Sequence, residues 1–305
     1  MTRIAILGDG LLGRRLFAYL APRERALLGE PPSLVMLAHS DFDVRDYDSL
    51  VAALRAHRPD VLINTVAYHN LTLCEQNPDL AFDINARGAE RVAGLCPTVY
   101  VSSDYVFSDG GPHDESLPGR QPRSVYGRSK LAGELATLEK DGIVVRVSGL
   151  YDHEYQSHKG PSFPEAMLSS WDPVELPTDQ VFSPTYAPDA AERIAQLALG
   201  LLSGEAELSG HTWDAHVSVN GIYHAANAGS VSWAAFGEEV LNLARQRRHV
   251  KPVVKRDRLR PTNSALRSTR LPPLRHWRVA LDEWWTARRE AIYRNREVSP
   301  LRDEA

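Results

Sequence analysis

Tyr126 and Lys130 stand four residues apart in the stretch SVYGRSKLAGE (124–134). On a helix this spacing puts both side chains on one face, with Cβ atoms about 5–6 Å apart. A free phenol, with a pKa of about 10, is a poor acid near neutral pH, and a neighbouring ammonium lowers that pKa. The pair therefore predicts a general acid for reduction of a carbonyl group, which needs a proton at oxygen and a hydride at carbon. Taken alone, Tyr126 and Lys130 could also be a chance pair on a helix surface.

A serine pair, Ser102 and Ser103, ends the apolar segment TVYVSS (98–103), which we expect to be a buried strand. In a parallel sheet the ligand crevice lies beyond the carboxyl ends of the strands. One hydroxyl can therefore point into the crevice, where Ser103 would hold a carbonyl oxygen by donating a hydrogen bond. Ser103, Tyr126 and Lys130 are the predicted catalytic residues.

A glycine loop, GDGLLG, follows the first apolar segment and opens a helical pattern. This is the context that the G-x-G-x-x-G pattern requires, because its glycines permit a tight turn, a close approach of a pyrophosphate and close packing of helix on strand. The helix N-terminus adds free N–H groups for phosphates. The loop therefore predicts a dinucleotide site at Gly8, Gly10, Leu11, Leu12 and Gly13.

The second expected strand ends in Ala38, His39 and Ser40, without the acidic residue that binds the ribose 2′-hydroxyl of NAD. Arg14 and Arg15 follow the last glycine and could meet a 2′-phosphate, although they could equally lie on a solvated helix face. This pattern favours NADPH as the cofactor, with NADH possible.

Strands and helices are expected to alternate strictly up to residue 150. The expected strands are RIAILG (3–8), SLVMLAH (33–39), DVLINT (60–65), TVYVSS (98–103) and GIVVRVS (142–148). Nearly continuous apolar strands in such an order are typical of a parallel sheet covered on both faces. We predict an α/β fold: a Rossmann-type doubly wound parallel sheet with a smaller irregular α/β substrate lobe. The dinucleotide-binding domain would comprise residues 1–149 and a return segment at 180–205, and the lobe residues 150–179 and 206–305.

The composition fits an ordinary globular protein, with 43% hydrophobic and 24% charged residues among 305. A formal net charge of −4 argues against nucleic acid or an anionic membrane as a partner. The two cysteines show no metal or disulfide pattern, and the first residues do not resemble a signal peptide. These features predict a cytoplasmic protein.

The chain resembles the extended short-chain dehydrogenase/reductases and, more narrowly, the dTDP-4-dehydrorhamnose reductase family, along nearly its whole length. The motifs that carry this resemblance are RPDVLINTVAY (58–68), SSDYVFSDG (102–110), VYGRSKLAGE (125–134), DQVFSPTYAPDAA (179–191), GIYHAAN (221–227), RPTNSAL (260–266) and HWRVALDEWW (276–285). Such a set is specific for the family, though not for one substrate.

The resemblance implies roles for individual residues. Tyr126 would be the proton donor, Lys130 its pKa partner and a ribose contact, and Ser103 the carbonyl anchor. The further cofactor contacts implied are Asp43, Val44, Ala67, Tyr68 and Asn85, and the substrate contacts are Ser103, Asp104, Val106, Tyr126, Gly149 and Phe182. For Asn85, a polar residue that merely bends a helix is the alternative.

Four departures from the family pattern matter. The glycine loop is one residue shorter than usual. Gly149 stands where a Trp would face the sugar, and Phe182 where a Gly is usual, so we expect open space beside the sugar at Gly149 and a preference for a ketosugar unlike the rhamnose precursor. A swing of Tyr151 or Trp171 into that space is the alternative. Arg15 replaces an acid that binds a divalent metal in some members, so no metal is predicted.

The predicted function is NAD(P)H-dependent reduction of the keto group of a nucleotide-diphosphate-linked 4-keto-6-deoxysugar, dTDP-linked by resemblance. Two alternatives stay open. One is an NADP-binding regulatory subunit of the methionine adenosyltransferase beta type. The other is a nucleotide-sugar epimerase or dehydratase, which would retain its cofactor. A monomer and a homodimer are both compatible with the sequence.

Overall fold

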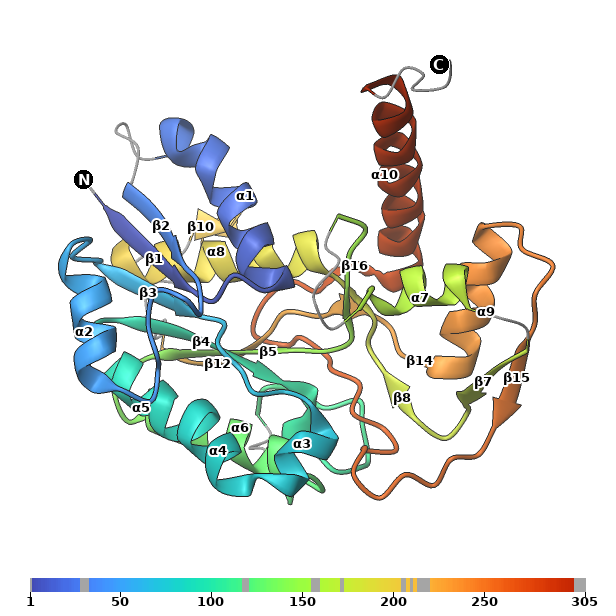
Figure 1. The fold of residues 1–305 in the computed structure, drawn as a ribbon, viewed down its shortest axis with the longest axis horizontal. Helices are drawn as coiled ribbons and strands as arrows, with labels where there is room; N and C mark the ends of the chain where they lie inside the picture. Colours follow the sequence, from blue (N-terminus) through green and yellow to red (C-terminus); the bar gives the residue numbers. More distant parts are fainter. Residues whose placement is uncertain are drawn as a thin grey trace, which may run out of the picture.

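The protein consists of a parallel sheet covered by helices and a smaller lobe beside it (Figure 1). The computed structural model describes residues 2–27, 33–116, 121–154, 160–170, 173–203, 207–208, 211–212 and 220–298. Most of the sheet part precedes the lobe in the sequence, but later segments of the chain return to the sheet.

The main sheet has six parallel strands in the order β12-β5-β4-β3-β1-β2. These strands are β1 (Arg3–Leu7), β2 (Ser33–Leu37), β3 (Val61–Asn64), β4 (Thr98–Ser103), β5 (Ile143–Val147) and β12 (Gly221–His224). The chain runs outward from β1 to β2 and then resumes on the other side of β1 with β3. This change of direction is the place where doubly wound sheets bind ligands. The predicted Rossmann-type sheet is confirmed.

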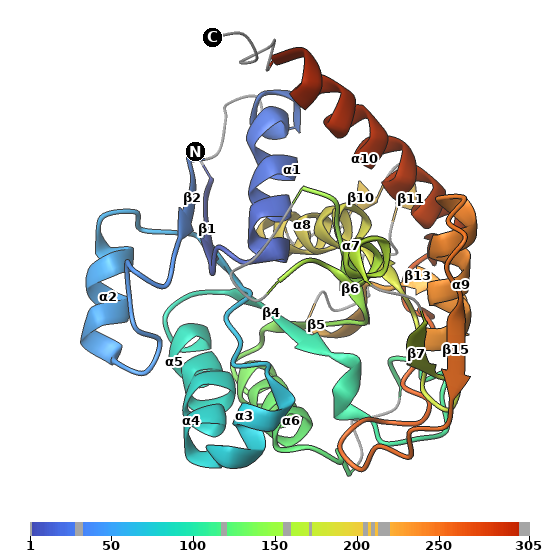
Figure 2. The same cartoon turned by 45° about the vertical axis from the view of Figure 1, so that its right-hand side comes forward.

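Alternate residues of each strand point to opposite faces, and both faces are buried. Ile4 and Ile6 pack under α1 (Leu11–Leu27) and α8 (Ala187–Ser203). Ala5 and Leu7 face α2 and α5 instead. Figure 2 shows α1 and α8 on one side of the sheet and α5 and α6 on the other. The bounds of the helices on this second face are α2 Tyr47–Arg55, α3 Leu71–Gln76, α4 Pro78–Phe82, α5 Gly88–Ala93 and α6 Val125–Leu138, with a π-helical turn at Asp83–Arg87.

One strand lies outside the predicted domain boundary. β12 pairs in parallel with β5, with Tyr223 opposite Val145. Residues 221–224 therefore belong to the main sheet, whereas the sequence placed 206–305 in the lobe. A four-residue strand carries no local sign of which sheet it joins, because that choice depends on the exposed edge of β5.

The lobe is made of short paired strands and an aromatic core. Its strand pairs are β6 (Leu150–Tyr151) with β9 (Thr185–Tyr186), β7 (Val174–Pro177) with β15 (Val250–Val253), β8 (Val181–Phe182) with β14 (Val231–Ser232), and β13 (Asn227–Ala228) with β16 (Leu274–His276). Outside the lobe, a further short pair of β10 (Glu207–Leu208) with β11 (His211–Thr212) follows α8 and contacts that helix. The helices are α7 (Phe163–Ser169), α9 (Trp233–Leu243) and α10 (Trp277–Val298). Phe236, Trp277 and Trp284 lie at the centre of the core.

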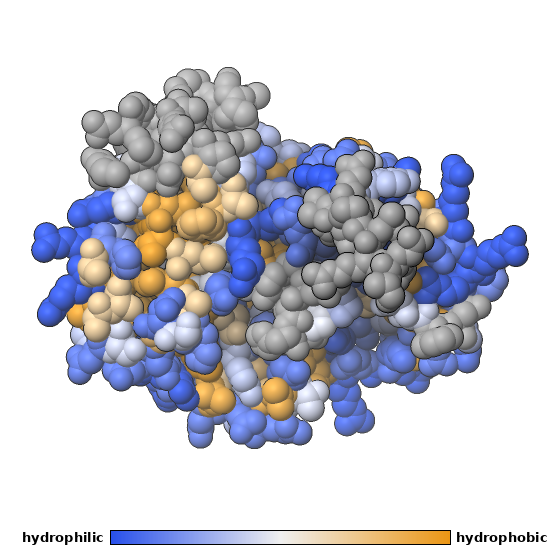
Figure 3. All heavy atoms as spheres, turned by 45° about the horizontal axis from the view of Figure 1, so that its top comes forward, coloured by the Kyte–Doolittle hydropathy of each residue, from blue (hydrophilic) through white to orange (hydrophobic). Residues whose placement is uncertain are grey.

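The surface mixes apolar and polar residues in the usual way. On the face drawn in Figure 3, hydrophilic residues dominate the margin and apolar residues gather toward one side. In the part of the chain that the structure describes, no helix is long and apolar enough to cross a membrane.

Candidate active site

The glycine loop between β1 and α1 has the backbone that a dinucleotide site needs. Gly8 has a φ of +102°, which side-chain-bearing residues rarely adopt. A Cβ at Gly13 would overlap the carbonyl oxygen of Gly8, so the start of α1 packs directly on the loop. A Cβ at Gly10 would meet nothing within 4 Å. The open side at Gly10, next to the N-terminus of α1, fits a pyrophosphate.

The charged residues around this loop are already paired. Arg14 donates to the backbone oxygen and carboxylate of Asp9. The carboxylate of Asp43 binds Arg45, which lowers the pKa of Asp43 to about 2. Asp43 is therefore ionised at neutral pH, and Arg45 donates to both of its carboxylate oxygens.

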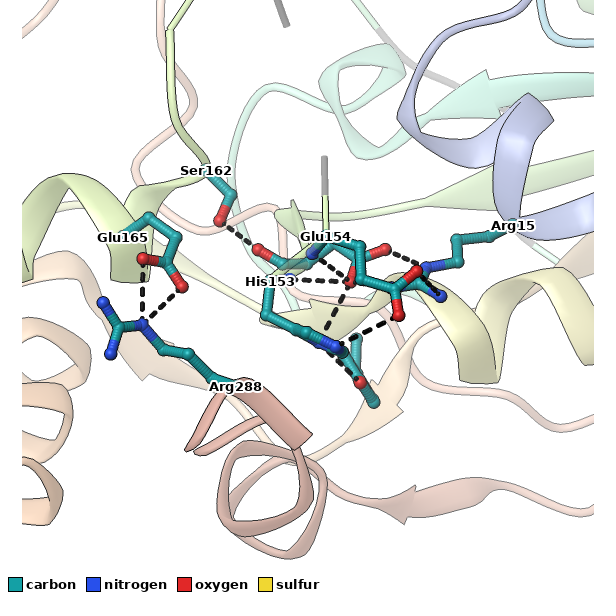
Figure 4. Close-up of polar contacts among 8 residues, drawn as sticks. Arg15, His153, Glu154, Ser162, Glu165 and Arg288 are labelled. Carbon is teal, nitrogen blue, oxygen red and sulfur yellow. Dashed lines mark hydrogen bonds and ion pairs between the residues drawn. The ribbon is translucent and has the colours of Figure 1, made fainter. Parts of the chain in front are cut away.

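Arg15 does not point toward a 2′-phosphate site. It donates to the buried carboxylate of Asp152, with 2.6 Å between Nη2 and Oδ1, and pairs with Glu154 at 2.8 Å. Figure 4 shows Arg15 reaching from α1 to the loop that carries His153 and Glu154. The suggestion that Arg15 binds a 2′-phosphate is therefore wrong for this conformation, because a buried ion pair holds the guanidinium elsewhere.

Five of the predicted cofactor contacts differ in burial. Leu12 and Val44 are buried in the core, so only their backbone can face a cofactor, while Leu11 is partly buried. Ala67 and Tyr68 are half-buried after β3.

Asn85 acts as a bridge. Its side chain is 0% exposed, accepts from the backbone N–H of Tyr68, and donates to the Tyr68 carbonyl and to Ser129 of α6. The predicted direct cofactor contact by the Asn85 side chain is therefore wrong, since its hydrogen bonds are spent on fixing Tyr68 to α6. The π-helical turn around Asn85 is the kind of local irregularity often found near functional sites.

The predicted catalytic residues meet at the carboxyl end of β4. Ser103 ends that strand, and Tyr126 lies in the first turn of α6, which Ser124 caps by accepting from the N–H of Gly127. Ser103 lies close enough to Tyr126 for its hydroxyl to act on the pKa of the phenol. The structure thus brings together two groups that are far apart in the sequence.

Lys130 lies one turn along α6 and is 1% exposed. Its ammonium donates to the carbonyl oxygen of Val101 at 2.6 Å and lies 4.0 Å from the centre of the Tyr100 ring. Burial lowers the pKa of Lys130 to about 7, against a smaller opposing effect of Glu134.

The pKa of Tyr126 shifts in the direction opposite to the expectation from sequence. Burial raises the pKa of the phenol, and the nearby Ser103 hydroxyl offsets only part of that rise. Desolvation dominates because it penalises the phenolate of Tyr126 and the ammonium of Lys130 alike. A phenol with a raised pKa stays protonated at neutral pH, which is the form that a proton donor needs.

Two predicted substrate contacts point into the protein. Val106 is fully buried with Phe107 and Leu266. Asp104 is 3% exposed and accepts hydrogen bonds from serine hydroxyls. Neither side chain faces a crevice, so the prediction that they touch substrate is wrong for both side chains.

The pocket position at Gly149 is filled from another strand. Gly149 has a φ of +49°, and a Cβ there would overlap the ring of Phe182. That ring is 3% exposed and stacks on Trp233, with 3.8 Å between ring centres. The expectation of open space beside Gly149 is therefore wrong on the side to which a Cβ would point. The ring of Phe182 fills that side and is packed between Gly149 and Trp233. Tyr151 is buried in the lobe core, and Trp171 lies outside the described residues.

Tyr105 and Arg260 are site residues that the sequence reasoning missed. The Tyr105 ring lies edge-on to Tyr126, with 5.7 Å between ring centres, and its hydroxyl accepts from Arg260 at 2.8 Å. Tyr105 lies inside SSDYVFSDG and Arg260 opens RPTNSAL, so both belong to motifs on which the family resemblance depends. Among the described stretches, no group of three or more His, Cys, Asp or Glu could hold a metal ion.

A Rossmann-type sheet, an open glycine loop and a Ser–Tyr–Lys set at the carboxyl end of β4 define an oxidoreductase of the short-chain dehydrogenase/reductase class. The model of the RmlD substrate binding domain family matches residues 2–292, and the chain belongs to this family. Its relatives include dTDP-4-dehydrorhamnose reductase of Streptomyces griseus, 34% identical over 92% of this chain and 91% of the relative. A probable dTDP-4,6-dihydroxy-2-methyloxan-3-one 4-ketoreductase of Streptomyces antibioticus is 33% identical, over 90% and 91%.

Solved structures agree with this assignment. The crystal structure of dTDP-4-dehydrorhamnose reductase from Bacillus anthracis in complex with NADP matches with a TM-score of 0.78 and 27% identity, covering 94% of this chain and 99% of that one. A dTDP-glucose 4,6-dehydratase from Streptomyces venezuelae, at 19% identity and a TM-score of 0.72, shares the fold.

Proposed function

We propose that this chain is an NADPH-dependent reductase of the keto group of a dTDP-linked 4-keto-6-deoxysugar, with Tyr126 as the proton donor. The observation that carries the proposal is the position of Ser103 at the carboxyl end of β4 beside the first turns of α6, which carry Tyr126 and the Lys130 that donates to β4. Relatives with reductase names along nearly the whole chain, and the NADP complex of a similar structure, support it.

The residues present fit the cofactor. Gly10 leaves room for the pyrophosphate, and Gly8 and Gly13 shape the turn beside the N-terminus of α1. Bound NADPH supplies the hydride that reaches the carbonyl carbon. The Tyr126 phenol gives its proton to the carbonyl oxygen, so the ketone becomes an alcohol and a phenolate remains. Lys130, one turn along α6 from Tyr126, would supply a positive charge that offsets this phenolate.

The test is oxidation of NADPH with a panel of nucleotide-linked 4-ketosugars, followed by loss of NADPH absorbance and by identification of the alcohol. Steady, substrate-dependent consumption supports the reductase. Sugar conversion without net NADPH consumption would instead indicate an epimerase or dehydratase. Tight NADP binding with no conversion of any sugar would favour a regulatory subunit.

A further inference from the structure

Arg15 of α1 forms ion pairs with two carboxylates of the lobe. Its Nη2 donates to Oδ1 of Asp152 at 2.6 Å, its Nε donates to Oδ2 of the same residue, and its Nη1 lies 2.8 Å from the carboxylate of Glu154. Figure 4 shows Arg15 and Glu154 facing one another in this group. The side chain of Asp152 is 0% exposed and that of Arg15 is 15% exposed. A bidentate pair with so little water around it fixes both the distance and the orientation of the two segments.

The two ends of this pair belong to different halves of the site. Arg15 lies in the second turn of α1, two residues after Gly13, and so moves with the glycine loop. Asp152 directly follows β6, which begins next to Gly149. The ring of Phe182 covers the side of Gly149 to which a Cβ would point, and we call these two residues the pocket wall. The pair therefore joins the expected cofactor loop to the pocket wall.

The segment that carries Asp152 is also fixed to the rest of the lobe. The backbone oxygen of Asp152 accepts from the hydroxyl of Ser162, just before α7, at 2.6 Å. The N–H of His153 donates to the Asp152 carboxylate at 2.6 Å. Nδ1 of His153 lies 3.2 Å from the hydroxyl of Tyr186, the last residue of β9, and β9 pairs with β6. A displacement of residues 150–154 is therefore passed on to α7 and β9.

The pair is difficult to break from one side only. A guanidinium stays protonated, so Arg15 supplies a permanent positive charge. Removing it leaves the Asp152 carboxylate buried without that charge, which is strongly unfavourable. The segment is then more stable when it turns toward water, and the pocket wall loses its link to α1.

We propose that Arg15 is a positioning residue that couples the two halves of the site, because it transmits the order that a dinucleotide imposes on α1 through Asp152 to the pocket wall. A pyrophosphate at the N-terminus of α1 immobilises that helix. When one side of a contact is already ordered, ordering the other side costs less conformational entropy. Cofactor and nucleotide sugar therefore raise one another's affinity by the same factor. The sugar part of this inference rests on the proposed function, whereas the link from α1 to the lobe does not.

Two other interpretations give different results. If Arg15 turns to a 2′-phosphate when the cofactor binds, Arg15→Met should weaken NADP+ binding at least about tenfold and leave NAD+ binding unchanged, because only NADP+ loses a charge-assisted hydrogen bond. If the pair only stabilises the fold, Arg15→Met should lower the free energy of unfolding and leave the mutual effect of the two ligands intact.

The first measurement is the affinity for dTDP-glucose, a nucleotide sugar with no keto group to reduce, by calorimetry with and without saturating NADP+. We expect NADP+ to tighten its binding to the wild-type protein at least about fivefold, since allosteric coupling typically amounts to about 5–150-fold. Arg15→Met should reduce this ratio to less than about twofold and change the affinity for NADP+ alone by less than about threefold. A ratio near one in the wild-type protein, or an unchanged ratio in the folded variant, would overturn the proposal.

Hydrogen exchange of lobe amides gives a readout that needs no sugar. The N–H groups of His153 and Glu154 both donate to the carboxylate of Asp152. NADP+ should slow their exchange at least about fivefold in the wild-type protein and leave it unchanged in Arg15→Met, because the order of α1 no longer reaches the segment. Equal slowing in both proteins would contradict the role given to Arg15. If dTDP-glucose does not bind the wild-type protein at all, the proposed function loses its substrate class, and the exchange still decides the role of Arg15.

Arg275→Met is the matched control. Nε and Nη2 of Arg275 bind the two carboxylate oxygens of Asp189 at 2.8 and 2.7 Å, and Nη1 pairs with Glu283, which repeats the arrangement at Arg15. These residues lie on β16, α8 and α10, outside both α1 and residues 150–154. Arg275→Met should therefore destabilise the protein and keep both the affinity ratio and the exchange effect. Loss of both in this variant would show that the coupling follows the general stability of the lobe, against the proposal.

Asp152→Asn tests the pair from its other side. The amide keeps the size of the side chain and one acceptor oxygen but removes the charge. Asp152→Asn and Arg15→Met should lower the affinity ratio to the same level, and the double variant should lower it no further, because both changes break one interaction. Additive reductions would show two separate effects and refute the assignment to this pair.

Arg15→Lys serves if Arg15→Met does not fold. Lysine keeps the positive charge but cannot form the two parallel hydrogen bonds to Asp152, so the affinity ratio should fall part of the way toward one. An unchanged ratio in Arg15→Lys would count against the proposal, because the orienting bonds would then carry no coupling.

Discussion

The carboxyl edge of the parallel sheet and the aromatic lobe place their side chains by different means. At the sheet edge, Ser103 and Tyr126 stand on a long strand and a long helix whose bounds follow from local pattern. In the lobe, two-residue strands join distant segments, as Phe182 of β8 meets Val231 of β14. This comparison assigns the catalytic side chains to the regular sheet edge. It assigns the shape of the substrate pocket to the irregular lobe.

The same contrast holds for charge. Arg146 and Glu134 form a fully buried pair at 2.7 Å beneath the sheet edge, and Ser102 donates to the same glutamate. The lobe core consists mainly of rings, with Phe182 stacked on Trp233 and Phe163 on Phe236, and an ion pair of the lobe such as Arg288 with Glu165 is more exposed than Arg146 with Glu134. Changes at the sheet edge should therefore alter catalysis and protonation, whereas changes in the lobe should alter stability and substrate choice.

The largest effect is expected from Tyr126→Phe. Removing a positioned general acid costs roughly 10²–10⁴-fold in rate. The variant keeps the ring that lies against Tyr105, so it should fold and bind NADPH normally. Steady-state kinetics on a confirmed ketosugar, with a cofactor titration, provide the measurement. Near-normal kcat would place the proton donor elsewhere.

Phe182→Ala tests the lobe side of the comparison. Truncation of a buried phenylalanine costs about 3–5 kcal/mol of unfolding free energy. It also leaves space beside Gly149, so the relative kcat/KM among epimeric ketosugars should change while the cofactor affinity does not. Denaturant unfolding and the substrate panel measure the two effects. Unchanged sugar preference would mean that Phe182 supports only the lobe core.

Gly10→Val tests whether Gly10 serves cofactor binding, in contrast to Gly13, which serves folding. Nothing within 4 Å opposes a Cβ at Gly10, so the variant should fold and yet bind NADPH at least about tenfold more weakly, because the side chain occupies the approach of the pyrophosphate. Gly13→Ala, by contrast, should destabilise the protein, since its Cβ would overlap the oxygen of Gly8. Equal cofactor affinity in a folded Gly10→Val protein would refute the predicted loop.

Lys130 should give stability a distinct pH dependence. Its pKa is about 7 when folded against 10.5 as the reference, so between these values the unfolded chain binds more protons. Lys130 therefore makes the free energy of unfolding rise with pH across this window, and its burial cost is largest below it. Lys130→Met should flatten that slope and be more stable than wild type near pH 7, as measured by urea unfolding. An unchanged slope would show that Lys130 keeps an ordinary pKa.

The smallest effect is expected from chelation. Arg15 already supplies the positive charge that Asp152 and Glu154 face, as Figure 4 shows for Arg15 and Glu154. EDTA should leave NADPH-dependent turnover unchanged within error. A loss of activity that magnesium restores would contradict this prediction.

The sequence alone determined the features that depend on local backbone geometry. Gly8 and Gly13 are required by one turn, and the apolar strands with intervening helices imply a doubly covered parallel sheet. Ser103 and Tyr126 could be chosen because a strand end and a helix start are local features that parallel topology brings together.

Only the tertiary structure decided the orientation and ionisation of these groups. Asp104 turned inward because Ser148 and Ser264, distant in sequence, offered hydroxyls there. Phe182 filled the space at Gly149 because β8 packs beside it, and β12 joined the sheet because β5 offered a free edge. The pKa of Tyr126 rose because burial, which depends on every neighbour in space, outweighs the single charge that its spacing to Lys130 suggests.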